Sequence, residues 1–205
     1  MGQIIGLLGG VASGKSTVAK RLRAAGWLVL DADEVARQVV CEPAVAQALA
    51  SRFGPDLFDE QGTLDRALLA RKAFSSPSET EALNAIVHPA VRQRLLSQLE
   101  RAGTRNVALD IPLLLESPLA DRVDTWVFIA SDEAQRERRA ADRNWEPGER
   151  ARREARQATL AEKRAAADHV LENNGTIDDL GAQVQALLRA WAAKISHHTP
   201  GDREP

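Results

Sequence analysis

The stretch IGLLGGVASGKST, residues 5–17, runs from apolar residues through several glycines to Lys15. It carries the pattern G-x-x-x-x-G-K-[ST] at Gly9, Gly14, Lys15 and Ser16. Glycines at this spacing let successive backbone N–H groups point at phosphate oxygens, and a following helix adds the positive end of its dipole. Lys15 would reach the terminal phosphates of a nucleoside triphosphate, and the Ser16 hydroxyl would ligate Mg²⁺. The motif therefore predicts nucleotide binding, but it does not distinguish hydrolysis, transfer and switching.

Five short apolar segments alternate with longer helical segments along the chain. The strand candidates are 3–8, 27–33, 106–112, 124–130 and 168–173. All but the last are nearly without polar alternation, which is typical of strands covered on both faces. The helix candidates are 15–25, 33–52, 65–101, 132–143, 149–166 and 177–194. We therefore predict an α/β protein of the P-loop NTPase fold class, with a five-stranded parallel sheet flanked by helices.

The spacing of these strands predicts a single domain, 1–205, with two additions to its core. A long, mostly helical stretch separates the second strand from the third, and an insertion of that size should form a helical subdomain over one end of the sheet. The segment NWEPGE divides an arginine-rich helical region, as the tip of a lid would. We expect a core at 1–33, 106–143 and 167–194, the helical subdomain at 34–105, a lid at 144–149 with its flanking helices, and a mobile tail at 195–205.

The composition is that of an ordinary globular protein, with 44% hydrophobic and 27% charged residues. A formal net charge of −2 provides no overall attraction to nucleic acid or to an anionic membrane. The apolar stretch near the N-terminus is too short for a signal peptide or a membrane span, and a single cysteine, Cys41, cannot form an internal disulfide. We expect a cytoplasmic protein with neither a nucleic-acid nor a membrane partner.

Three classes of P-loop protein are compatible with the loop: small-molecule kinases, nucleotide-dependent switches and nucleic-acid-dependent proteins. A GTPase should carry an Asn-Lys-x-Asp tetrapeptide, which is absent, and the D-x-x-G match at 59–62 does not follow a buried strand, so we interpret it as a turn. Acidic residues are interleaved with the arginines of 135–164, as on a solvated helix surface with ion pairs. The alternative is a lid whose few inward arginines meet polyphosphate, and a kinase requires that arrangement.

Phosphoryl transfer to a hydroxyl also requires a carboxylate beside the acceptor oxygen. The segment LDADEVAR places Asp31 and Asp33 at the carboxyl end of the second strand, at the edge where ligands bind in open α/β sheets. The alternative is that both only cap the next helix, which is a common role of Asp. Asp110, at the end of the third strand, presents a similar choice between acting on Mg²⁺ through water and capping a turn.

Segments from Ile4 to about Leu188 resemble, in order, those of one enzyme family. GLLGGVASGKSTVA is similar to that family's GLTGGIGSGKSTVA, and DADEVARQVV to its DAD-x-x-AR-x-VV. LDRALLARKAF followed by LNAIVHPAVR resembles LDR…HP-x-VR, DIPLLLE resembles PLL-x-E, and RQATLAEKRAAADHVLENNG resembles Q…K…AD-x-V-x-x-N-G. The family is the dephospho-CoA kinases, which phosphorylate the ribose 3′-hydroxyl of dephospho-CoA with ATP in the last step of coenzyme A synthesis.

On the acceptor side, the resemblance implies that Asp33 is the carboxylate that acts as base, while the role of Asp31 stays open. Arg37, one helical turn after Asp33, and His88 would line the acceptor pocket, so the subdomain at 34–105 would bind dephospho-CoA. For His88 the alternative is a helix boundary, because the residue before a proline is pushed out of the helical region.

On the nucleotide side, the resemblance implies ATP with Mg²⁺ on Ser16. The residues expected to bind the nucleotide are Gly10, Val11, Ala12, Ser13, Gly14, Lys15, Ser16, Thr17, Asn174 and Gly175. Asn174 and Gly175 would lie by the adenine, or they form a turn, which Asn-Gly strongly favours. Ala12 stands where the family has glycine, and it restricts the backbone freedom that glycine would allow.

The expected catalytic residues are Lys15, Asp33 and a lid arginine. Where the family has an Arg-Asp pair, this sequence has Asp142 and then Arg143. Arg143 takes the role if the lid is one residue shorter here, and Arg139 is the reserve. The resemblance predicts a dephospho-CoA kinase; the alternatives are a nucleoside, nucleotide or sugar-acid kinase, and a regulatory ATPase without a small acceptor.

Overall fold

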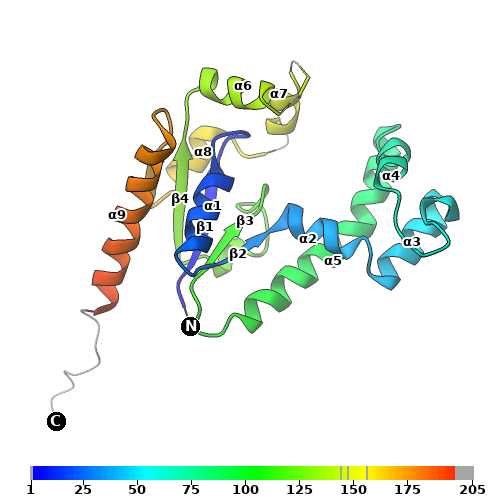
Figure 1. The fold of residues 1–205 in the computed structure, drawn as a ribbon, viewed down its shortest axis with the longest axis horizontal. Coiled ribbons are helices and arrows are strands. Elements are labelled where there is room, and N and C mark those ends of the chain that lie inside the picture. The colour runs from blue at the N-terminus through cyan, green and yellow to red at the C-terminus, as the bar shows by residue number, and fades with distance from the viewer. Residues whose placement is uncertain (1, 144, 147, 156, 197–205) are drawn as a thin grey trace, which may run out of the picture. The chain divides into compact units, whose positions relative to one another are not determined.

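The computed structural model describes residues 2–143, 145–146, 148–155 and 157–196. Parts of the expected lid tip, Asn144 and Pro147, and most of the expected tail lie outside the described residues. The chain divides into two compact units, Met1–Val29 with Thr104–Pro205, and Leu30–Gly103. We call the first the sheet unit and the second the helical unit, and Figure 1 labels most elements of both.

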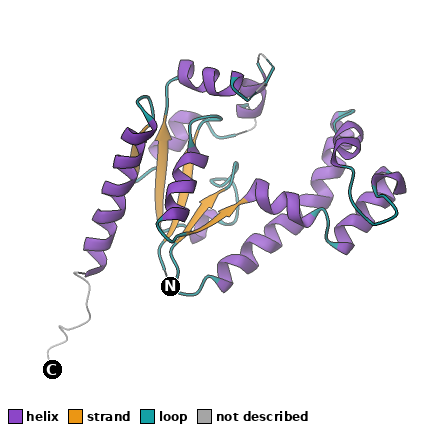
Figure 2. Ribbon diagram, viewed as in Figure 1, coloured by secondary structure: helices purple, strands orange, loops and turns teal. Residues whose placement is uncertain are grey.

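The sheet has five strands in the spatial order β2-β3-β1-β4-β5, drawn as orange arrows in Figure 2. The strands are β1 (Ile4–Gly9), β2 (Leu28–Asp31), β3 (Val107–Asp110), β4 (Thr125–Ala130) and β5 (His169–Glu172). β1 pairs in parallel with β3 and β4, and β4 pairs in parallel with β5. The predicted five-stranded parallel sheet is confirmed, and the loop after its central strand opens at the carboxyl edge, where ligands bind in such sheets.

The described part of the sheet unit also contains five α-helices and one 3₁₀ helix. They are α1 (Lys15–Ala24), η2 (Ala120–Arg122), α6 (Glu133–Ala141), α7 (Glu149–Glu154), α8 (Leu160–Ala165) and α9 (Ile177–Ser196). The helix expected over 149–166 is divided, because Thr159 starts a new helix. Its hydroxyl accepts from the Glu162 N–H, and the Glu162 carboxylate accepts from the Thr159 N–H, which is a capping box.

Helices cover both faces of the sheet. On one face, Ile5 and Leu7 of β1 belong to a core that includes buried residues of α1 and α9. On the opposite face, Leu8 and Phe128 pack with Leu160 of α8. Successive strand residues point to opposite faces, so a strand buried on both faces consists of apolar residues without alternation. This explains the pattern on which the strand predictions depended.

In the helical unit, three helices pack on a long fourth one. The elements are α2 (Ala32–Val39), α3 (Pro43–Phe53), the 3₁₀ helix η1 (Pro55–Leu57), α4 (Arg66–Ala73) and α5 (Pro77–Arg101). α2, α3 and α4 each contact α5, where Leu95 and Leu99 are buried. The two long helices expected here are divided at Pro43 and Pro77, which occupy first turns, where the missing N–H is not needed.

α5 continues through His88 and Pro89, so the interpretation of His88 as a helix boundary is wrong. Pro89 removes one hydrogen bond from the helix interior, that to the carbonyl of Ala85. Ala85, His88 and Pro89 are all exposed, so water can hydrogen-bond the carbonyl in its place. Within the described residues, no helix is long and apolar enough to cross a membrane.

Candidate active site

The loop between β1 and α1 has the backbone of a phosphate-binding loop. Gly9 has a φ of 149° and Gly14 a φ of 104°, which L side chains rarely adopt. A Cβ at Gly14 would lie 2.1 Å from Asn173 Nδ2, so space as well as conformation requires glycine there. The Ser13 N–H donates to the Gly10 carbonyl at 3.2 Å and tightens the turn. The N–H groups of a helix point toward its N-terminus, so the start of α1, at Lys15, faces the loop.

Ala12 is the only non-glycine residue with a positive φ in the described part of the chain, at 62°. This left-handed conformation costs an alanine about 1–2 kcal/mol, and such strain persists only where the surroundings hold it in place. Ala12 is buried, with 7% of its surface exposed. Ala12, where the resembling family has glycine, therefore adopts a left-handed backbone conformation that glycine would adopt without strain.

Lys15 is folded back into the loop. Its Nζ donates to the carbonyls of Gly9 and Gly10 at 3.1 and 3.0 Å. Burial lowers the pKa of Lys15 from 10.5 to about 8, while the charges of Asp110 and Glu154 raise it. Burial has this effect because the ammonium loses hydration. A phosphate oxygen beside Nζ would favour the charged form and raise the pKa again.

Asp110 and Ser16 are candidate donors for a divalent cation. Asp110 ends β3, and its charge reaches Lys15; Ser16, in the first turn of α1, is exposed. Hydroxyl and carboxylate oxygens are ligands that Mg²⁺ accepts, and this ion takes most of its other ligands from water and phosphate. The described residues include no group of three or more His, Cys, Asp or Glu residues that could hold a metal. The donors therefore fit a magnesium ion bound largely through a nucleotide.

Arg139 supports the loop from outside. Its Nη2 donates to the Asn173 carbonyl at 2.8 Å, and its Nη1 donates to Ser131 Oγ at 2.9 Å and to the Ser13 carbonyl at 3.4 Å. Asn173 follows β5, is buried, and donates from Nδ2 to the same Ser13 carbonyl at 2.7 Å. Burial lowers the pKa of Arg139, and the charge of Arg143 adds to this. Arg139 thus uses its donors within the protein.

Arg143 has a different environment. It follows α6 and is exposed, and its guanidinium carbon lies 5.6 Å from the centroid of the Trp145 ring. Arg153 lies 4.2 Å from the same centroid, so Trp145 has cation–π contacts with two guanidinium groups. The charge of Arg143 lowers the pKa of Lys15, which brings Arg143 within electrostatic reach of the loop.

Asn174 and Gly175 bend the chain between β5 and α9, and the adenine contact expected of them stays a prediction. Asn174 Oδ1 accepts from the Asp132 N–H at 2.8 Å and so connects this turn to the start of α6. Asp179 Oδ2 lies 2.6 Å from the position a Cβ would take on Gly175. The residue that contacts the phosphate loop is Asn173, directly before this pair. The sequence analysis missed Asn173, although it lies in the closing motif.

Gln157 and Lys163 are a second pair that the sequence analysis left without a role. Lys163 is buried, with 4% of its surface exposed, and donates to Gln157 Oε1 at 2.7 Å. Burial lowers the pKa of Lys163, and its charge in turn lowers the pKa of Lys15. The two residues are the Q and K of the closing motif. Their occurrence in one motif was the signal from which a contact between them could have been predicted.

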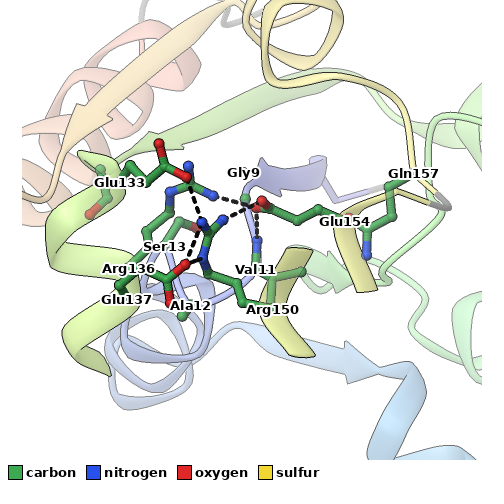
Figure 3. A network of polar contacts seen from close by, with 12 residues as sticks. Gly9, Val11, Ala12, Ser13, Glu133, Arg136, Glu137, Arg150, Glu154 and Gln157 are labelled. Atoms are coloured by element: carbon green, nitrogen blue, oxygen red, sulfur yellow. Dashed lines mark hydrogen bonds and ion pairs between the residues drawn. The ribbon is translucent and has the colours of Figure 1, made fainter. Parts of the chain in front are cut away.

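Three further charged side chains lie at the loop, from α6 and α7, as Figure 3 shows. Arg136 and Arg150 are buried, at 5% and 4% exposure. The Glu154 carboxylate accepts from both, and it also accepts from the Val11 N–H at 2.8 Å. Arg150 Nε donates to Glu137 at 2.8 Å. Ion pairs therefore account for these arginines of 135–164, and the sequence analysis singled out neither Arg136 nor Glu154 for a site.

In the helical unit, the structure distinguishes Asp31 from Asp33. Asp31 Oδ1 accepts from the N–H groups of Asp33 and Glu34 at 2.9 and 3.0 Å and caps α2, so the capping interpretation is confirmed for Asp31. Asp33 contributes its backbone N–H to this cap, and its side chain is on an exposed residue. Arg37, four residues later in α2, is exposed and faces the same side as Asp33. His88 is exposed within α5.

The D-x-x-G segment is a turn, as expected. Asp59 Oδ1 accepts from the N–H groups of Gln61 and Thr63 at 3.0 and 2.7 Å. Gly62 has a φ of 76°, which the turn requires and glycine allows. The segment is therefore a local turn, whereas the D-x-x-G element of a GTPase would directly follow a buried strand.

A glycine-rich loop between a buried central strand and a helix, with its lysine directed inward, defines a P-loop nucleotide-binding protein. The model of the family described as Dephospho-CoA kinase matches residues 3–179. The chain belongs to the dephospho-CoA kinase family, and it is an ATP-using kinase.

Relatives and a solved structure agree with this assignment. The dephospho-CoA kinase of Geobacillus kaustophilus is 47% identical over 195 residues, which cover 92% of this chain and 96% of the relative. That of Corynebacterium glutamicum is 41% identical over 198 residues, covering 94% and 98%. The structure of dephospho-CoA kinase from Campylobacter jejuni covers 92% of this chain and 96% of its own, with a TM-score of 0.67 at 20% identity, which shows a common fold.

Proposed function

We propose that the protein transfers the γ-phosphoryl group of ATP to the ribose 3′-hydroxyl of dephospho-CoA, giving coenzyme A and ADP. The observation that carries this proposal is a phosphate loop with Lys15 folded into it, in a chain that matches the family over residues 3–179. The reaction is an in-line displacement in which the protein positions both substrates and stabilises the charge on the transferred group.

On the nucleotide side, Lys15 and Arg143 bind the phosphates. The protonated Lys15 exchanges its bonds to the two loop carbonyls for bonds to phosphate oxygens, which are charged and form shorter, stronger hydrogen bonds. Arg143 is the lid arginine, because it is exposed and its charge lowers the pKa of Lys15. Arg139 instead donates its hydrogen bonds to the Asn173 carbonyl and to Ser131 Oγ. Loop N–H groups within 10–17 hold the phosphates in place, apart from those of Ser13 and Thr17, which donate to the Gly10 and Gly14 carbonyls.

On the acceptor side, Asp33 orients the 3′-hydroxyl and accepts its proton. Asp31 is committed to the cap of α2, and Asp33, two residues later, presents an exposed carboxylate. A carboxylate needs only hydrogen-bond reach of the hydroxyl to act as a general base. Arg37 and His88, both exposed in the helical unit, bind the anionic parts and the polar groups of dephospho-CoA.

Ser16 and Asp110 would hold the magnesium ion that binds with the nucleotide. Bound Mg²⁺ neutralises charge on the β- and γ-phosphates. Asn174 and Gly175 lie by the adenine, at the turn that follows β5. The reaction takes place in the cytoplasm, which suits the free, exposed thiol of Cys41.

The test is a phosphotransfer assay with the full chain, Mg-ATP and a panel of acceptors. Dephospho-CoA should stimulate ADP formation, while nucleosides, nucleoside monophosphates and gluconate should not. Lys15→Ala is the control, because it removes the ammonium group proposed to contact the phosphates. Stimulation by another acceptor would transfer the assignment to that kinase class, and stimulation by none would favour a regulatory ATPase.

A further inference from the structure

Arg136 and Glu154 lie on the loop, and the proposed reaction does not use them. Arg136, on α6, donates from Nη1 to Glu154 Oε1, on α7. A Cβ built on Gly10 would lie 2.7 Å from each of these two atoms, so the ion pair rests directly on the loop backbone, as Figure 3 shows. Arg136 Nε is buried and has no hydrogen-bond partner among the described residues. A buried guanidinium with an unused donor can accept a further anion.

Glu154 also accepts a hydrogen bond from a backbone amide of the loop. The Val11 N–H donates to Glu154 Oε1 at 2.8 Å, and amides of such a loop are the groups that bind phosphate oxygens. A carboxylate and a phosphate offer the same feature here, a negatively charged oxygen that accepts from an N–H and from an arginine. Glu154 is therefore an internal anion on an anion-binding loop.

We propose that Arg136 is a ligand of the nucleotide phosphates, and that Glu154 competes with the nucleotide for Arg136 and for the Val11 N–H. The inference rests on the proposed function and adds a second arginine to its phosphate site. A phosphate oxygen that takes the Val11 N–H displaces the carboxylate of Glu154. Glu154 then keeps Arg150, whose Nη1 it already contacts, and Arg136 pairs with the phosphate. Every buried charge stays paired in both arrangements, which such charges require.

A structural role for Glu154 has the opposite consequence. If Glu154 only attached α7 to the loop, its neutralisation would loosen the surroundings of the loop and weaken nucleotide binding. If Glu154 competes with the nucleotide, its neutralisation removes the competing anion and strengthens nucleotide binding. The sign of the change in affinity therefore distinguishes the two roles.

The experiment measures the Kd of a non-hydrolysable ATP analogue with Mg²⁺, by calorimetry on the full chain without an acceptor. Glu154→Gln keeps the shape and removes the charge, and it should tighten binding by about tenfold, the equivalent of one charged hydrogen bond. Arg136→Lys keeps the charge but loses the planar, forked donor, and it should weaken binding by about fivefold or more. If Glu154→Gln does not fold, Glu154→Asp replaces it: its carboxylate is one methylene shorter, so its contact with the Val11 N–H is weakened and nucleotide binding should again tighten.

Glu137→Gln is the matched control. Glu137 also pairs with Arg150, but the structure shows no contact between Glu137 and the loop, so its Kd should equal that of the unchanged chain. Equal or weaker binding by Glu154→Gln overturns the inference, as does an equal gain in Glu137→Gln. The binding experiment contains no acceptor, so its result does not depend on whether the protein phosphorylates dephospho-CoA. A failure in that reaction would overturn the proposed function and leave the binding result valid.

Discussion

Replacing Ala12 by glycine is expected to leave the free energy of unfolding nearly unchanged, whereas Ala→Gly in a helix lowers it. Ala12 has a φ of 62°, which costs alanine about 1–2 kcal/mol and glycine almost nothing. Two losses oppose this gain. Glycine adds about 0.4–1 kcal/mol of conformational freedom to the unfolded chain, and one buried methyl group is worth about 0.8 kcal/mol. The sum is within about 1 kcal/mol of zero.

The matched control is Ala186→Gly, at an exposed position inside α9. There the backbone is helical, nothing offsets the entropy of glycine, and the loss should be about 0.5–1 kcal/mol. Urea unfolding followed by tryptophan fluorescence and by circular dichroism measures both variants, and 1 kcal/mol corresponds to about 2–4 °C in Tm for a chain of this size. A loss at Ala12 of clearly more than about 1 kcal/mol, and larger than the loss at Ala186, would refute the argument from left-handed strain.

Three further predictions concern the proposed reaction. Asp33→Asn should lower kcat by about 10²-fold or more, and near-normal turnover of this variant would contradict the assignment of Asp33 as the base. Asp31→Asn should change stability and kcat little, because asparagine is also a good helix cap. Because the pKa of Lys15 is about 8 instead of 10.5 and the cation binds phosphate, kcat/KM for ATP should fall as pH rises through about 8; a profile flat to pH 10 argues against this. Arg143→Ala should lower kcat with little change in Tm, and Arg139→Ala should lower Tm; the reverse pattern would make Arg139 the lid arginine.

The strands and the loop motif could be predicted because their signals are local. A strand covered on both faces is apolar throughout, and a loop that curls around phosphate needs glycine at set positions, of which Gly14 is an example. The divided helices were also within reach, since Pro43 and Pro77 each begin a helix. The helix through His88 was not, because His-Pro favours a boundary and only the exposed surroundings of Pro89 let water replace the lost bond.

Asp31 and Asp33 show where local sequence stops being informative. Both are carboxylates beside the same helix start, and either could cap it. The extended backbone of Asp31, with φ −106° and ψ 115°, turns its carboxylate toward the N–H groups of the helix. The assignment of one residue to the cap and the other to exposed solvent therefore follows from backbone geometry.

By itself, the sequence determined the α/β class, the nucleotide loop and the family, because apolar runs, glycine spacing and ordered motifs depend on residues close together in the chain. Only the tertiary structure decided which charges meet at that loop. Glu154 lies 143 residues from Val11 in sequence, and in the arginine-rich segment the two interpretations, ion pairs and phosphate ligands, have the same charge pattern. The packing of α6 and α7 onto the loop decides which arginines lie beside Glu154 there, because the interaction of a guanidinium with an anion depends on the distance between them.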